Sequence, residues 1–171
     1  MTKISKGFTL VELIIYLAIF ALIVTGFVSF AVSVSNARNK VFVAQEVQAN
    51  GRDALNLITQ KIMSANGINF GTSSFGVDPG ILSLSMASGA LNPTIIDLDA
   101  PDGRIRIQEG ASAPVYIIGA NVRAANFVFT DLSLGSDREN VKISFTLEYA
   151  NSDDREFQFS QSLETSVSLR Q

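Results

Sequence analysis

The sequence predicts an α+β protein, in which one long amino-terminal helix is followed by an antiparallel sheet. Two observations support this prediction. Residues 8–65 contain no proline and continue with helical spacing of apolar residues. Beyond residue 80 the pattern changes to alternating apolar and polar side chains, as expected for half-buried strands. The 171 residues are enough for one such domain.

The first part of the predicted helix is a candidate membrane span. Leu13 to Val34 is a run without a formal charge, and its apolar side chains cover every face of a helix. A helix of this run is about 33 Å long, enough for a hydrocarbon core of about 30 Å. Lys3 and Lys6 precede it without any acidic residue. This charge bias predicts a cytoplasmic amino terminus and a body outside the cytoplasmic membrane.

Two other interpretations of this segment remain open. A cleaved secretory signal peptide could use Ser35-Asn36-Ala37 as its cleavage site, but the apolar run is longer than signal peptides normally carry. An unprocessed single-pass anchor explains everything except Glu12 and its neighbours. A carboxylate at membrane depth costs roughly 2.5–3.5 kcal/mol, which makes Glu12 a candidate functional residue. The alternative interpretation is that Glu12 has no function and lies at the membrane interface, where its side chain reaches water.

The residues around Glu12 favour a function. The segment closely resembles the processing site of type IV pilins and of the related pseudopilins of type II secretion: Lys6-Gly7-Phe8-Thr9-Leu10-Val11-Glu12-Leu13-Ile14. The resemblance implies a basic leader that a prepilin peptidase removes between Gly7 and Phe8. It also implies N-methylation of Phe8, and subunit assembly that depends on Glu12.

The resemblance divides the chain into four parts. It implies a leader peptide at residues 1–7, a transmembrane and assembly helix at 8–34, a stalk helix at 35–66 and a β-rich head at 67–171. The implied partners are the prepilin peptidase and N-methyltransferase, other pilin or pseudopilin subunits, an inner-membrane assembly platform, and membrane lipid before assembly. No cofactor is implied. The expected location is the inner membrane and then a periplasmic or extracellular filament.

Simple electrostatics agrees with these roles. Cleavage would leave an ammonium group on Phe8, and Glu12 supplies a carboxylate four residues further on. Both charges are costly in apolar surroundings unless they are paired. They could pair within one helix at i,i+4 spacing, or between neighbouring subunits. Pairing between subunits would set the axial position of one helix against the next.

The helical pattern continues as a narrow apolar stripe through the stalk, at Ala44, Val47, Gly51, Ala54, Ile58, Ile62 and Ala65. We expect this stripe to pack on the protein's own sheet rather than on a partner helix. Asn66-Gly67 indicates the end of the helix. The Gly- and Ser-rich residues 67–80 are expected to form a loop.

The head is expected to form seven strands, at residues 81–85, 94–98, 104–108, 115–118, 122–132, 141–150 and 156–169. Turn residues stand at Pro101-Asp102-Gly103 and at residues 151–154. Pilin-like proteins share this arrangement of a long helix on antiparallel sheet. The expected core residues of the later strands are Phe127, Phe129, Phe145, Leu147, Phe157 and Phe159.

Composition argues against an enzyme. The chain has no histidine, cysteine or tryptophan, which excludes imidazole bases, thiol nucleophiles and zinc sites built from Cys or His. Lys142 is the only lysine of the head and no catalytic motif surrounds it. Asp97, Asp99 and Asp102 superficially suggest a calcium loop, but their spacing is wrong for an EF-hand and a hairpin turn is expected there.

Charge argues against nucleic acid as a partner. From Phe70 onward the chain has 13 acidic and 7 basic side chains. Such an acidic body is poorly suited to neutralise phosphates.

Finer resemblances concern the type of subunit. The stalk from Val47 to Ile62 and the closing residues 165–170 look similar to J-type pseudopilins and W-type minor pilins. Major type IVa pilins usually carry a carboxy-terminal disulfide loop, whereas this chain has no cysteine. K-type tip subunits usually lack the glutamate that this chain has at Glu12. The calcium-binding loop of G-type pseudopilins has no counterpart in this sequence. A low-abundance subunit that initiates or caps a filament is therefore expected. The alternative is a membrane-anchored binding module that captures an extracytoplasmic ligand and never polymerises.

Overall fold

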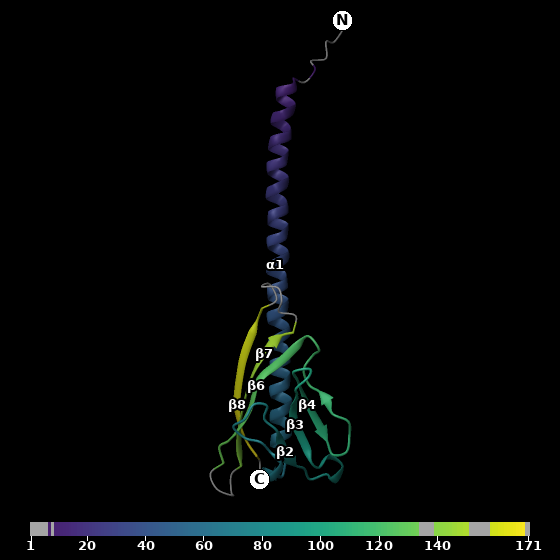
Figure 1. Cartoon of the computed structure of the whole chain (residues 1–171), viewed down its shortest axis with the longest axis vertical. Helices are drawn as coiled ribbons and strands as arrows, with labels where there is room; N and C mark the ends of the chain where they lie inside the picture. Colours follow the sequence, from purple (N-terminus) through teal and green to yellow (C-terminus); the bar gives the residue numbers. More distant parts are fainter. Residues whose placement is uncertain (1–6, 8, 134–138, 151–157, 170–171) are drawn as a thin grey trace. The chain divides into compact units, whose positions relative to one another are not determined.

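A computed structural model describes Gly7 and residues 9–133, 139–150 and 158–169. The chain divides into two compact units, residues 1–39 and residues 40–171. Figure 1 shows the elements of both units and their order along the chain. The predicted α+β class is confirmed: one long helix is followed by antiparallel strands.

Helix α1 spans Leu10–Met63 and contributes to both units. The predicted helix from residue 8 to residue 65 is confirmed to within two residues at each end. It ends where Ser64 and Ala65 make the last helical backbone bonds, to the carbonyls of Gln60 and Ile62. The next amide, of Asn66, donates instead to the carbonyl of Ser85 in the sheet, so the chain leaves the helix directly into strand pairing.

The first sheet has five strands in sequential order: β1 (Gly67–Ile68), β2 (Leu82–Ser85), β3 (Thr94–Asp99), β4 (Arg104–Glu109) and β5 (Val115–Tyr116). All its neighbouring strands are antiparallel. Two short 3-10 turns accompany them, η1 (Phe70–Thr72) and η2 (Gly89–Leu91). The β3–β4 turn falls at residues 100–103, which confirms the predicted hairpin, and Gly103 donates its N–H to the carbonyl of Asp99.

The expected loop at residues 67–80 is partly wrong. Its first two residues form β1, in which Gly67 lies opposite Ser85 and Ile68 opposite Leu84. Glu139 supports this strand, because its carboxylate accepts the N–H of Ile68 at 2.7 Å. A two-residue strand leaves no alternation to detect, so only this tertiary pairing reveals it.

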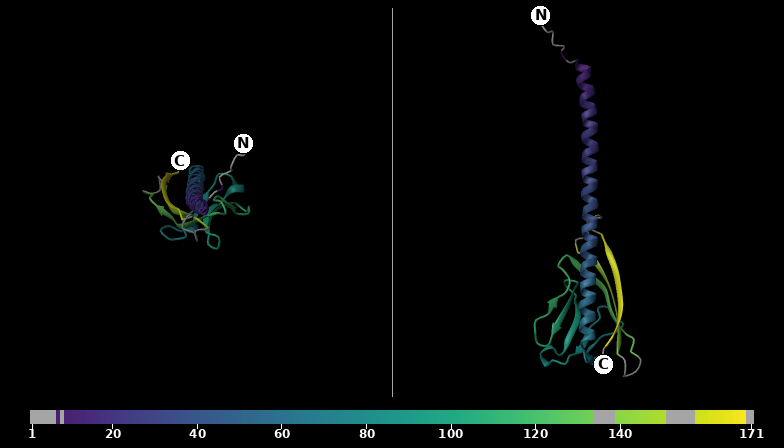
Figure 2. Two further views of the ribbon diagram at one scale, coloured as in Figure 1. Left: turned by 90° about the horizontal axis from the view of Figure 1, so that it is seen from above. Right: turned by 180° about the vertical axis from the view of Figure 1, so that it is seen from behind.

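The second sheet has three strands, β6 (Val122–Asp131), β7 (Asn140–Tyr149) and β8 (Ser160–Ser168), again antiparallel and in sequential order. The sequence predicted antiparallel strands but did not indicate that they form more than one sheet. The structure places them in two separate sheets. The division falls between β5 and β6. Figure 2 shows the strands from above and from behind.

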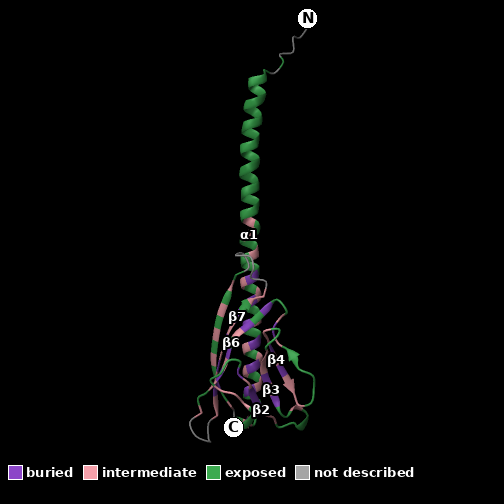
Figure 3. Cartoon of the chain, viewed as in Figure 1, coloured by how far each residue is buried: buried purple, intermediate pink, exposed green. Residues whose placement is uncertain are grey.

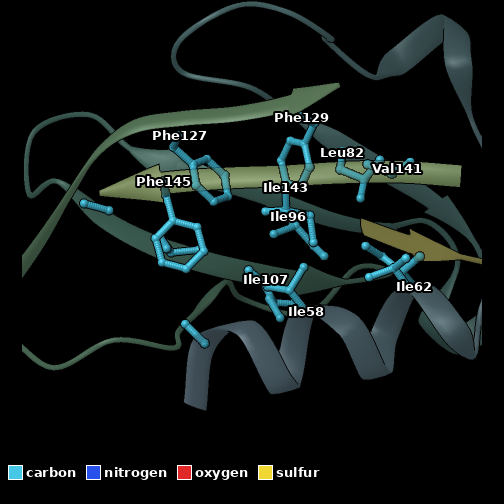
Figure 4. Packing of buried hydrophobic residues seen from close by; sticks show 14 of the residues in the cluster. Ile58, Ile62, Leu82, Ile96, Ile107, Phe127, Phe129, Val141, Ile143 and Phe145 are labelled. Carbon is cyan, nitrogen blue, oxygen red and sulfur yellow. The ribbon is translucent and has the colours of Figure 1, made fainter. Parts of the chain in front are cut away.

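The core of the second unit lies between the helix and the sheets. The buried residues of α1 are Val43, Val47, Gly51, Ala54, Ile58 and Ile62. This confirms the predicted stripe and its packing on the protein's own sheet, with the difference that Val43 is buried and Ala44 only half-buried. Figure 4 shows Ile58 and Ile62 of the helix beside buried side chains of both sheets.

Most of the phenylalanines predicted for the core are confirmed. Phe127, Phe129 and Phe145 are buried, and the rings of the first two meet edge to face with centroids 4.9 Å apart. Leu147 is also buried, whereas Phe159 is half-buried and Phe157 lies outside the described residues. Figure 4 shows the three rings on one side of their sheet.

Candidate functional site

The predicted processing and assembly residues lie around the start of α1. Thr9 precedes the helix, and its carbonyl accepts the first helical bond, from Leu13 at 3.1 Å. Its hydroxyl accepts the N–H of Glu12 at 3.3 Å. These two bonds make Thr9 the N-cap, which satisfies one of the amides that every helix start leaves unpaired.

This role of Thr9 is not among the sequence-based predictions. The signal was present, because Thr9-Leu10-Val11-Glu12 has the Thr-x-x-Glu spacing of a capping box. In the structure the backbone of Glu12, at the third helical position, is held by Thr9. Thr9 therefore caps the start of the helix, and the Thr-x-x-Glu spacing places the carboxylate of Glu12 in the first turn.

Glu12 is exposed in this unit and is the acidic residue of the first turn. The amino terminus of a helix carries roughly half a positive charge, so a carboxylate in the first turn is favourable there. Gly7 is exposed and outside regular structure. Phe8, Lys3 and Lys6 lie outside the described residues.

The helix that follows presents an apolar surface on every side. Bulky side chains between Leu10 and Phe30 are exposed in this unit, Leu22 by 75% and Phe27 by 71%. Figure 3 shows this part of α1 coloured as exposed. Thr25 is polar, but its hydroxyl donates to the carbonyl of Ala21 at 2.8 Å, so it needs no outside partner. This stretch is long and apolar enough to cross a membrane, and none of it is buried within the unit.

Two of the three acidic residues that suggested a calcium loop, Asp97 and Asp99, have protein partners. Arg106, opposite Asp97 across β3 and β4, donates to both its carboxylate oxygens, at 2.7 and 3.0 Å. Asp99 accepts the hydroxyl of Tyr116 at 2.6 Å and lies 3.4 Å from Arg106. The hydrogen bond to Asp99 raises the pKa of Tyr116, and the hydrogen bond to Asp97 raises the pKa of Arg106. The group is a cross-strand ion-pair network beside a turn.

Lys142, the only lysine of the head, also has a protein partner. The ammonium of Lys142 lies 2.8 Å from the carboxylate of Glu164 on the next strand. Within the described residues, no three acidic side chains gather in a way that could hold a metal ion.

Comparison with known proteins yields one finding, at the amino terminus. The family model described as the prokaryotic N-terminal methylation motif matches residues 2–28. No curated protein and no solved structure matches the chain. The matched residues contain Gly7, Phe8, Thr9 and Glu12, together with most of the exposed apolar surface of α1. The chain carries the methylation motif that is the signature of type IV pilins and pseudopilins, on a single apolar helix suited to a membrane-anchored subunit.

Proposed function

We propose that this protein is a structural subunit, a minor pseudopilin or minor pilin, of a type II secretion or type IV pilus filament. One observation carries the proposal: the methylation motif is joined to a helix whose apolar surface finds no cover within its own unit. Such a surface must be covered by lipid or by other helices. Lipid covers it before assembly, and neighbouring subunits cover it in the filament.

Processing is the first step of the proposed function. A prepilin peptidase, which also methylates the product, would cut between Gly7 and Phe8 and leave a methylated amine on Phe8. An exposed glycine outside regular structure suits this cut, because a protease needs an extended backbone and meets no side chain at Gly7. The leader lysines, Lys3 and Lys6, keep this end on the cytoplasmic side. The head then lies outside the inner membrane.

Assembly is the second step, and Glu12 is its proposed determinant. The new ammonium on Phe8 would stand directly before the helix cap at Thr9, where the helix dipole is also positive. The carboxylate of Glu12 is in the turn that follows. In an apolar filament, Glu12 of one subunit would pair with the Phe8 amine of a neighbour, and a subunit out of register would leave both charges unpaired.

The four proposed parts of the chain follow from these steps. Residues 1–7 are removed, residues 8–34 anchor and assemble the subunit, residues 35–66 form the stalk and residues 67–171 the head. The proposed partners are the peptidase, other subunits of the filament and an inner-membrane assembly platform. The motif implies a structural subunit rather than an enzyme.

The experiment is co-expression with a prepilin peptidase, followed by mass spectrometry of the intact membrane protein. We expect loss of Met1–Gly7 and gain of one methyl group. Gly7→Val is the matched control, since it should block cleavage without changing the helix. A chain that keeps its full mass beside an active peptidase would contradict the proposal and favour the membrane-anchored binding module.

A further inference from the structure

Strand β8 (Ser160–Ser168) forms the outer edge of the three-stranded sheet, because it pairs only with β7. The pairing has an unbroken register from Asn140 opposite Ser168 to Glu148 opposite Ser160. In Figure 1, β8 lies on the outer side of its sheet. The outer edge of this nine-residue strand is thus available for pairing.

The hydrogen bonds at the two ends of β8 show which backbone groups are unpaired. Leu169 donates its N–H to the carbonyl of Glu139, and Phe159 accepts the N–H of Tyr149. In an antiparallel pair, hydrogen-bonded and non-hydrogen-bonded residues alternate. Odd-numbered residues of β8 therefore bond to β7. The even-numbered residues direct their N–H and C=O groups away from it: Ser160, Ser162, Glu164, Ser166 and Ser168.

We call these five residues the free edge of β8. All five are exposed, and no hydrogen bond to their backbone groups occurs among the described residues. Their side chains offer little protection against pairing. Proteins usually block an edge with proline, lysine or an inward charge, whereas four of the five residues here are serine. The single charge, on Glu164, is paired with Lys142.

The remaining edges of the fold are short or covered. Along β6, Gly76 and Gly80 donate N–H groups to the carbonyls of Phe129 and Phe127, and Asp78 accepts the N–H of Phe127. Ala124 of the same strand donates to Gly103. The edge strands of the other sheet, β1 and β5, have two residues each. Among the described residues, β8 alone presents a long open edge.

We infer that the free edge of β8 accepts an extended strand from a different subunit of the same filament, which continues the three-stranded sheet. Main-chain hydrogen bonds would supply the affinity, as in other cases of strand addition. The inference rests on the proposed function, which brings the heads of neighbouring subunits together.

A second copy of this chain fits the edge poorly. Antiparallel pairing of two β8 strands about their centres would place Glu164 opposite Glu164, and like charges directly opposite are unfavourable.

A helical array of identical copies is also unsuitable. It joins two different surfaces of each copy, and the described residues of this head form no second long edge to receive β8. The occupant is therefore a strand of another subunit, assembled beside this one.

The test is amide hydrogen exchange of the 160–168 segment in the full chain. The detergent-solubilised, purified chain is compared with filaments isolated from cells that make all the subunits. In the purified chain, we expect slow exchange only at the odd-numbered amides. In filaments, we expect up to five further slow amides in this segment.

Two variants give an independent readout. Ser162→Pro with Ser166→Pro removes two free-edge N–H groups and leaves the backbone bonds to β7 intact, since proline is tolerated at such edge positions. It also removes the side-chain hydrogen bond between Ser162 Oγ and Thr146 Oγ1 of β7. We expect incorporation into filaments to fall by about tenfold, from the loss of two backbone hydrogen bonds. Ser162→Thr with Ser166→Thr retains both N–H groups and should assemble normally. Equal thermal unfolding of the two double variants shows that the head is intact.

Each outcome decides a different point. Filaments that contain the processed chain but show no added protection would overturn the inference and leave the proposed function standing. Slow exchange of the even-numbered amides in the purified chain would also overturn the inference, because that protection would indicate pairing between copies of this chain. A processed chain that never enters filaments would overturn both the inference and the proposed function.

Discussion

Gly51 of α1 lies directly against Leu163 of β8. A Cβ atom at Gly51 would come within 2.7 Å of Leu163 Cδ1 and 3.4 Å of Leu147 Cδ1. The helix and the three-stranded sheet therefore approach closely because position 51 has no side chain. Glycine in the middle of a helix costs roughly 1 kcal/mol relative to alanine, and this contact is the compensating gain.

Replacing this glycine should separate helix and sheet. We expect Gly51→Leu to lower the free energy of unfolding of the head by about 1–3 kcal/mol, the usual cost of overpacking a filled core. The control is Ala49→Leu on the exposed face of the same helix, which should change stability by about 0.5 kcal/mol or less. Urea unfolding of both chains in detergent measures the difference. Equal effects would show that the close approach is unimportant.

Gly110 should be less tolerant still. It has a φ of +54°, and a Cβ atom there would clash with the backbone carbonyl of Ala90. Gly103 has a similar φ of +63°, but its Cβ would only touch Arg123 at 3.4 Å. We expect Gly103→Ala to cost about 1–2 kcal/mol from left-handed backbone strain, and Gly110→Ala to cost more. Similar melting temperatures for the two variants would contradict the proposed clash.

Strand β6 offers a test of the two faces of its sheet. Phe127 and Phe129 are buried, whereas Val128 between them is half-buried and points to the other face. We expect Phe127→Asp and Phe129→Asp to prevent folding, since Phe→Ala alone typically costs about 3–5 kcal/mol. Val128→Asp should retain a cooperative unfolding transition. Equal damage from all three would show that both faces are covered.

Glu12 can be tested separately from its capping partner. We expect Glu12→Ala to be cleaved and inserted normally, because it removes a costly charge from the membrane segment. Filament incorporation should fall by a factor of hundreds, since an unpaired charge where a buried pair stood typically costs about 3–5 kcal/mol. Glu12→Gln tests whether charge is required.

Thr9→Ala is the matched comparison. It removes the cap bond to Glu12 and should cost about 1 kcal/mol of helix stability, with much milder effects on assembly. If Thr9→Ala and Glu12→Ala reduce incorporation equally, Glu12 acts through the helix start alone. Normal incorporation of both Glu12 variants would refute the pairing with Phe8.

Tyr116 should titrate late because of Asp99. The hydrogen bond from its hydroxyl to Asp99 raises the pKa of Tyr116 above the ordinary value of about 10. A raised folded pKa means that this bond stabilises the head below pH of about 10 and is lost as pH rises through the folded pKa. Ultraviolet titration should show a late tyrosine transition that Tyr116→Phe removes and Asp99→Asn shifts to lower pH. An unchanged titration in Asp99→Asn would contradict the role of that hydrogen bond.

The sequence alone determined the long helix, the fold class and the processing motif. These features depend on local order: an uncharged run from Leu13 to Val34, a stripe at helical spacing, strict alternation from Val141 to Tyr149, and the motif around Gly7 and Glu12. Each of these patterns lies within a continuous stretch of residues and can be recognised without knowing how the remaining chain folds. The bounds of α1 and of most strands were therefore predicted within a few residues.

The tertiary structure alone decided how these elements meet. It divided the strands into two sheets, paired Gly67 and Ile68 with β2, brought Gly51 against Leu163, and left one edge of β8 open while loop residues covered the edge of β6. Each of these relationships joins residues far apart in the sequence. Such contacts form only where the folded chain brings backbone groups and side chains together. Neither the spacing nor the composition of a segment identifies the distant residue that pairs with it or packs on it.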